Sequence, residues 1–216
     1  MQQRRLNIAY RVQHAEGRDA ALERLLIRLP PAVVVTDRET DDPNPMRNYL
    51  RCLADPGDAT HLCVIQDDAI VCEGFVGLVS QAVGERPDDL ISLFVGGLPG
   101  KSQIDFLRAL KRRERWAPIY MPGITHVVAM VWPVVTAAAF VEWFPPPYKI
   151  PGTKGPPYRS DDMVVGYWAR ITKRQVWATV PCLVEHPDDV PSVAQGNRGG
   201  DGLDRGRMAI HFADTY

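Results

Sequence analysis

Short apolar runs alternate with segments of helical periodicity through the first hundred residues. Four runs are mostly apolar, as strands buried on both faces are, and we expect strands at residues 6–12, 32–36, 62–66 and 90–94. Helical spacing and helix-start signals between them predict helices, which we expect at residues 17–29, 45–53 and 73–83. This β-α-β-α-β-α-β order is typical of an α/β fold with a mostly parallel central sheet flanked by helices.

The second half of the chain is less regular. We expect strands at residues 124–132 and 175–184, and helices at residues 104–115, 136–143 and 160–170. Residues 144–157 contain six prolines and two glycines, which predicts an exposed loop or lid. We therefore expect one domain over residues 1–216, made of two halves and a Gly-rich tail, with boundaries at 1–98, 99–197 and 198–216.

Composition narrows the class of protein without choosing a function. The chain has 216 residues, 45% of them hydrophobic and 24% charged, which is ordinary for a soluble globular protein. The net charge of −1 gives no overall attraction to nucleic acid or membrane, although a local patch remains compatible with it. The longest apolar region, 127–141, is too short to span a bilayer and is broken by Pro133.

The N-terminal segment and the cysteines both predict a cytoplasmic location. The start Met-Gln-Gln-Arg-Arg leads into only a short apolar run, so we expect no signal peptide and a cytoplasmic protein, within a host cell if a phage encodes it. The four cysteines form no C-x-x-C pair, which predicts reduced thiols and argues against zinc. These cysteines are Cys52, Cys63, Cys72 and Cys182.

The clearest chemical signal is the pair Asp67-Asp68, which follows the apolar run at 62–66. In an open α/β sheet, ligands bind where the strands end. Two adjacent carboxylates repel each other unless a cation or hydrogen bonds compensate, and carboxylate oxygens suit Mg²⁺ or Mn²⁺. The alternative is an ordinary turn, where Asp is common. We favour a site for a divalent cation and a phosphorylated nucleotide.

A second acidic pair, Asp161-Asp162, opens the helix expected at 160–170. One carboxylate there is explained by capping of the orphan amides. The other remains available as a general base at the mouth of the site. We prefer Asp162 for this role and keep Asp161 as the second choice.

Four further residues are weaker candidates for ligand binding. His186 follows an apolar strand; such a histidine is usually structural, and it becomes a credible metal ligand only beside the carboxylates. Asp37 ends the second strand, where an acid often accepts a hydrogen bond from a ribose or base. The chain has no G-x-G-x-x-G and no P-loop motif, so Arg11 and Arg47, with the cation, are the candidates for holding phosphates.

Basic residues gather in the segment 101–116. A charge run of this kind is usually a solvated helix face. Beside loops rich in Gly and Pro, it can instead hold a nucleic-acid backbone. The residues that we single out for that contact are Lys111, Arg112 and Arg113.

Taken together, these motifs resemble GT-A fold glycosyltransferases. The stretch Val64-Ile-Gln-Asp-Asp68 looks like the Asp-x-Asp or Asp-Asp element of that fold, and Pro181-Cys-Leu-Val-Glu-His186 is similar to its late histidine segment. More narrowly, Thr60-His-Leu-Cys-Val-Ile-Gln-Asp-Asp-Ala69 resembles small phage-encoded glycosyltransferases, some of which are thought to modify hydroxymethylated bases in DNA. One departure is Gln66, which stands where a strict Asp-x-Asp triplet has its first Asp.

The resemblance implies a GT-A-like fold with residues 1–98 as the nucleotide-sugar-binding half and residues 99–197 on the acceptor side. It implies that Asp68, with His186, binds a divalent cation on the donor diphosphate and that Asp67 contacts the donor ribose or sugar. It also implies that an acid of the second pair deprotonates the acceptor. The expected activity is metal-dependent, inverting transfer from a nucleotide-sugar, with a UDP-sugar as first choice, to an acceptor hydroxyl such as a 5-hydroxymethyl pyrimidine in DNA.

Two other classes of function fit the same residues. A metal-dependent phosphohydrolase or nuclease would use the carboxylates to activate water. A non-catalytic module would bind a nucleotide-sugar and tolerate loss of Asp162. Two separate acidic pairs favour an enzyme over the binding module.

Overall fold

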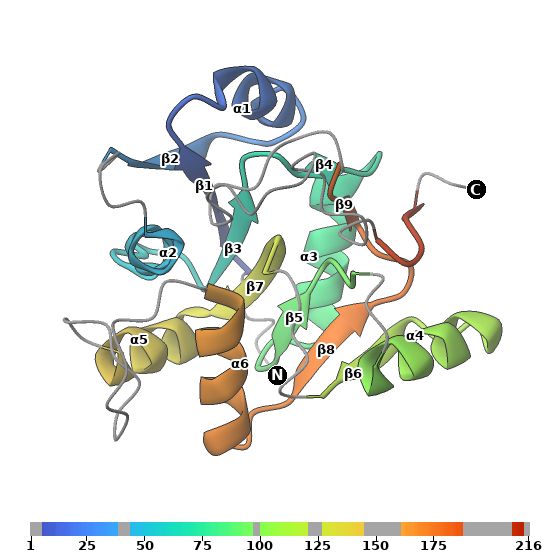
Figure 1. Cartoon of the computed structure of the whole chain (residues 1–216). Helices are drawn as coiled ribbons and strands as arrows, with labels where there is room; N and C mark the ends of the chain where they lie inside the picture. The colour runs from blue at the N-terminus through green and yellow to red at the C-terminus, as the bar shows by residue number, and fades with distance from the viewer. Residues whose placement is uncertain are drawn as a thin grey trace, which may run out of the picture.

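Seven strands form one mixed sheet that runs through the middle of the molecule (Figure 1). The computed structural model describes residues 6–38, 44–96, 100–120, 127–144, 161–187 and 209–213. The strand order is β2-β1-β3-β7-β5-β8-β6. The strands are β1 (Ile8–Ala15), β2 (Ala32–Asp37), β3 (His61–Gln66), β5 (Leu90–Ser92), β6 (Trp116–Ile119), β7 (Ala129–Pro133) and β8 (Val176–Thr179).

The expected α/β fold is confirmed, with one difference in the sheet. Strands β1, β2 and β3 pair in parallel, as do β5 and β8. However, β7 lies between β3 and β5 and is antiparallel to both, and the edge strand β6 is antiparallel to β8. Five of the seven strands thus point the same way. Hydrophobic periodicity predicts that a strand is buried but not which neighbour it pairs with, so the insertion of β7 was not foreseen.

Six helices occupy the described part of the chain and cover both faces of the sheet (Figure 1). Residues of α2, α4, α5 and α6 pack in one apolar cluster, and residues of α1 and α3 pack in the other. The helices are α1 (Asp19–Leu26), α2 (Pro45–Leu53), α3 (Phe75–Glu85), α4 (Lys101–Lys111), α5 (Val134–Trp143) and α6 (Asp161–Ile171).

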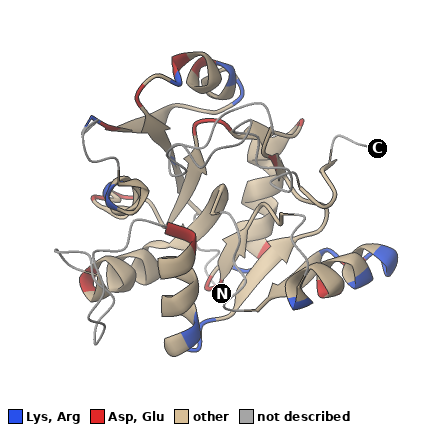
Figure 2. Ribbon diagram, viewed as in Figure 1, with Lys and Arg blue, Asp and Glu red and all other residues tan. Residues whose placement is uncertain are grey.

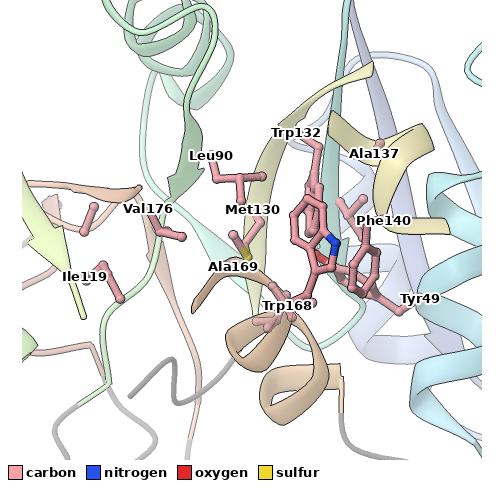
Figure 3. Packing of buried hydrophobic residues seen from close by; sticks show 14 of the residues in the cluster. Tyr49, Leu90, Ile119, Met130, Trp132, Ala137, Phe140, Trp168, Ala169 and Val176 are labelled. Atoms are coloured by element: carbon pink, nitrogen blue, oxygen red, sulfur yellow. The ribbon is translucent and has the colours of Figure 1, made fainter. Parts of the chain in front are cut away.

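Alternation along the strands separates these two clusters. In β3, Leu62 and Val64 face the α2 side while Cys63 and Ile65 face the α3 side. The centre of the first cluster is Trp132, which is fully buried (Figure 3). Its indole N–H donates to the Tyr49 hydroxyl at 2.8 Å, and its ring lies against aromatic neighbours whose centroids are 5–6 Å away. The neighbouring rings are Phe140 at 5.2 Å and Trp168 at 5.9 Å.

Local signals explain why α2 begins and ends where the sequence predicts. Asn44 accepts a hydrogen bond from the Arg47 amide at 3.1 Å, and Pro45 occupies the first helical turn, where its missing N–H costs nothing. Strand β2 likewise begins at Ala32 and ends at Asp37, as expected. These elements fix the positions of the strand ends around which the candidate site is built.

Three elements differ from the expectation in ways that matter for function. The strand expected at 175–184 is two strands, β8 and the two-residue β9 (Val184–Glu185), which pairs with β4 (Ile70–Val71) in a separate ladder. The basic helix ends at Lys111, and Trp116 begins β6 instead of ending that helix. The expected lid at 144–157 lies outside the described residues, apart from Phe144, as does most of the tail from 198 onward.

All four cysteines are free and buried. Burial raises the pKa of the Cys52 thiol and of the Cys182 thiol to about 12. Such thiols stay protonated near neutral pH and are poor nucleophiles. No helix in the described ranges is long and apolar enough to cross a bilayer.

Candidate active site

The two acidic pairs converge on the C-terminal end of β1. Gln13 and His14 are neighbours in this strand, and their side chains point to opposite faces of the sheet. The His14 ring lies 2.9 Å (Nδ1–Oδ2) from Asp67, which follows β3. Gln13 donates to the Asp161 carboxylate at 3.4 Å and to the Pro45 carbonyl at 2.9 Å. A single strand end therefore links acids that lie far apart in the sequence.

Asp67 is held from three sides. Its Oδ2 accepts the Ala15 amide at 2.8 Å beside the His14 contact, and its Oδ1 accepts from Arg18 Nη1 at 3.0 Å. The Asp67 side chain is only 2% exposed. Burial raises the pKa of this carboxyl, and the Ala15 amide and the Arg18 guanidinium oppose that rise without cancelling it. Burial of the charged Asp67 carboxylate is therefore unfavourable, and its hydrogen-bond partners offset part of that cost.

Asp68 lies beside His186, as the sequence suggested for a pair of metal ligands. The distance from Asp68 Oδ2 to His186 Nε2 is 3.1 Å, and both side chains are fully buried. The β4–β9 ladder produces this contact: Ile70 pairs with Glu185, so Asp68 and His186 flank the two paired residues. Glu185 fixes the turn by accepting from the His186 amide at 2.8 Å.

The donors at this point fit a divalent cation held jointly by protein and substrate. Ligands in neighbouring positions on an octahedral Mg²⁺ lie about 3 Å apart when each bond is about 2.1 Å, and the Asp68–His186 distance matches that spacing. Within the described ranges no three His, Cys, Asp or Glu side chains gather as a metal site. A Mg²⁺ or Mn²⁺ ion here would complete its shell with phosphate oxygens and water, as Mg²⁺ commonly does.

The second pair is held mainly through amide groups. Asp161 is 5% exposed, and its Oδ1 accepts the Asp162 amide at 3.0 Å in the first turn of α6. Asp162 is half-buried and accepts a hydrogen bond from the Val127 amide just before β7. Asp161 therefore serves the helix start and the Gln13 contact, and Asp162 keeps more access to solvent. Asp162 as a general base stays a prediction, and its greater exposure is compatible with that role.

The residues expected to hold the nucleotide are occupied by structural partners. Asp37 accepts from Arg47 Nη2 at 2.9 Å and from the Asn44 amide at 3.0 Å, so these two candidates pair with each other. Arg11 lies in the middle of β1, and its Nη2 donates to the Asp55 carbonyl beyond the end of α2 at 2.7 Å. The structure does not bring Arg11 to the carboxylate edge.

The basic candidates lie across the sheet from the acids. Lys and Arg colour both ends of α4 in Figure 2, and the three candidates Lys111, Arg112 and Arg113 are exposed. Trp116 pairs with Thr179 at the end of β8, so this segment meets the edge at which β3 also ends. Four strand spacings separate β3 from β6, or roughly 19 Å.

Sequence reasoning missed three residues of this cluster. Arg18, in the turn after β1, touches both carboxylates of the first pair; His14 touches Asp67 of the first pair and Gln13 touches Asp161 of the second. A basic residue directly after Gly17 at a strand end was the available signal for Arg18. The roles of His14 and Gln13 depend on which elements meet in space, and no spacing rule reveals that.

Comparisons with known proteins leave the family open. No protein-family model matches the chain, and no curated protein matches it. Among solved structures, the chain is similar to one titled "Crystal Structure of A197 from STIV", with 12% sequence identity, coverage of 83% of each chain and a TM-score of 0.47. A similarity of this size carries no information about the reaction.

Proposed function

We propose that this protein is a metal-dependent glycosyltransferase that moves a sugar from a nucleotide-sugar to an acceptor hydroxyl with inversion. The observation that supports the proposal most is that Gln13 and His14, neighbours at the end of β1, contact one acid of each pair, while Asp68 lies beside His186. The first pair suits the donor diphosphate, and the second pair suits proton removal. The sequence resemblance to GT-A glycosyltransferases points the same way.

In this proposal Asp68 and His186 hold the donor end of the site. A divalent cation bound there would neutralise the negative charge that grows on the departing nucleoside diphosphate. Asp67 positions the turn that carries Asp68, through its contacts with His14, Ala15 and Arg18. The buried setting strengthens each of these electrostatic contacts.

Asp162 acts as the base on the acceptor. The acceptor oxygen attacks the anomeric carbon, the bond from that carbon to the diphosphate oxygen breaks, and Asp162 takes the hydroxyl proton. The Val127 amide holds the carboxylate in place. Since one displacement occurs on one face of the sugar, the product has the opposite anomeric configuration.

A donor screen by thermal shift tests the proposal. UDP-, GDP-, CMP- and dTDP-sugars are each mixed with the protein, with and without Mn²⁺ or Mg²⁺. We expect one nucleotide class, with UDP first, to raise the melting temperature only when metal is present, because a ligand of the folded state stabilises it by mass action. No shift with any donor, or phosphate release and DNA cleavage without a sugar donor, would contradict the proposal and favour a hydrolase.

We further propose hydroxymethylated DNA as the acceptor, supported by the resemblance and by the exposed basic residues after α4. At 3.4 Å per nucleotide, a strand that reaches from the acids to Lys111, Arg112 and Arg113 covers about six nucleotides. Transfer to oligonucleotides should therefore improve up to about that length and then level off. Exchanging the three basic residues for Gln should flatten the salt dependence of DNA binding, and an unchanged slope would argue against this surface.

A further inference from the structure

A single guanidinium nitrogen bridges the first acidic pair. Arg18 Nη1 lies 3.0 Å from Asp67 Oδ1 and 2.6 Å from Asp68 Oδ2. One positive charge thus compensates two adjacent buried carboxylates, which would otherwise repel each other strongly. Arg18 does for this pair what a bound cation would do.

Arg18 is more exposed to solvent than the two carboxylates that it contacts. Its side chain is 14% exposed, whereas those of Asp67 and Asp68 are 2% and 0% exposed. It follows Gly17, whose φ of +87° turns the chain from β1 into α1, and it precedes the first residue of that helix. Of these three side chains, that of Arg18 is therefore the most accessible to a ligand from solvent.

The oxygen that Arg18 contacts most closely is also the one that faces His186. Asp68 Oδ2 lies 3.1 Å from His186 Nε2. A divalent cation held by Asp68 and His186 needs this oxygen, and its charge repels the guanidinium at such short range. The present contact of Arg18 with Asp68 Oδ2 and a metal bound at the same oxygen therefore weaken each other.

We propose that Arg18 is an exchangeable counter-ion of the Asp67–Asp68 pair. It neutralises the pair before the donor binds, and it turns onto the donor diphosphate when a divalent cation takes its place on Asp68. The planar guanidinium suits phosphate oxygens as well as carboxylates, so the exchange replaces one charged contact by another. This inference rests on the proposed function for the identity of the diphosphate and on the structure for the exchange.

Binding of Mn²⁺ alone, followed by electron paramagnetic resonance of the free ion, tests the first half. We expect Arg18→Gln to bind Mn²⁺ at least about tenfold more tightly than the unchanged protein, because a competing positive charge is gone. Arg24→Gln, on the exposed side of α1, is the matched control and should bind Mn²⁺ like the unchanged protein. The gain should vanish in the double variant Arg18→Gln/Asp68→Asn.

Pyrophosphate tests the second half without a choice of nucleotide. With Mg²⁺ present throughout, calorimetry should show that Arg18→Gln binds pyrophosphate about tenfold more weakly, since one charge-assisted contact is lost. The melting temperature of each variant with Mn²⁺ confirms that it is folded at the temperature of measurement. Mn²⁺ affinity that is unchanged or lower in Arg18→Gln, a gain that survives Asp68→Asn, or unchanged pyrophosphate affinity would overturn the proposal.

These results separate the inference from the proposed function. Neither probe contains a sugar or a base, so the counter-ion exchange can hold while every nucleotide-sugar fails in the donor screen. Conversely, metal-dependent transfer with an Arg18→Gln variant that binds Mn²⁺ no better than the unchanged protein would retain the glycosyltransferase and reject the exchange.

Discussion

The same dipeptide, Asp-Asp, occurs twice around one strand end and is treated differently each time. Asp67 and Asp68 are buried against the guanidinium of Arg18 and the imidazole rings of His14 and His186. Asp161 and Asp162 take hydrogen bonds from amides of the chain and from the Gln13 amide. The comparison teaches that the partners, more than the acids themselves, decide whether a carboxylate suits cations or protons.

The largest effect should follow from removing the donor-side acid. Asp68→Asn should lower kcat/KM for transfer by about 1,000-fold, because cation stabilisation of the leaving group is worth several kcal/mol. Metal-dependent donor binding should weaken in parallel in calorimetry. Asp88→Asn, an exposed acid before β5, is the control and should leave both unchanged. Full activity of Asp68→Asn would reject this pair as the donor site.

The next effect should come from the second pair and should differ in kind. Asp162→Asn should lower kcat by about 100- to 10,000-fold, the usual contribution of a general base, and should spare donor binding. Asp161→Asn should act less on kcat and more on stability, because this side chain is buried at the start of α6. Steady-state kinetics and thermal melts of both variants measure the contrast, and the reverse ranking in kcat would move the base to Asp161.

Neighbouring residues of β1 allow the two pairs to be tested separately. His14→Gln should weaken metal-dependent donor binding by about tenfold, since a hydrogen bond to a charged group is worth about 1.5 kcal/mol. Gln13→Ala should instead lower kcat several-fold while donor affinity holds, because Gln13 touches Asp161. Donor affinity from calorimetry and kcat from product assays give the two readouts. Equal effects of both variants on both readouts would mean that the pairs act as one unit.

The smallest effect concerns pH. Burial raises the pKa of Asp67 in the folded state, so between the ordinary pKa of about 3.9 and that raised value the folded chain binds more protons than the unfolded one. The contribution of Asp67 to the free energy of unfolding therefore falls as pH rises through this window and stays low above it. The melting temperature of Asp67→Asn minus that of the unchanged protein should rise with pH there. A flat difference, matching that of the exposed control Asp58→Asn, would show that the pKa is not raised.

Much of the fold could be predicted from the sequence because local signals were strong. Continuous apolar runs predicted β2 and β3, and Pro45 predicted the start of α2. The antiparallel place of β7 and the two-residue ladder of β4 with β9 could not be predicted, since both depend on long-range pairing that leaves no periodicity.

The residues of the candidate site also differ in whether a local sequence signal identified them. Asp67, Asp68 and Asp161 were identifiable because an acid directly after a strand or at a helix start is a local signal. Arg18 offered only a weak local signal, its place after Gly17 at a strand end, and Gln13 offered none, because their contacts with the carboxylates depend on elements that the fold brings together. Arg11 and Arg47 were chosen for their charge. In the structure Arg11 donates to the Asp55 carbonyl and Arg47 pairs with Asp37.

The β4–β9 ladder also has a consequence for the order of assembly. It joins two short segments separated by more than half of these 216 residues, and it brings His186 against Asp68. This contact can therefore form only after a ribosome has released residues 70–186, and closing so long a loop costs entropy that only later packing returns. The nascent chain carries Asp68 well before His186, so Asp68 spends the synthesis of the intervening segment without its histidine partner.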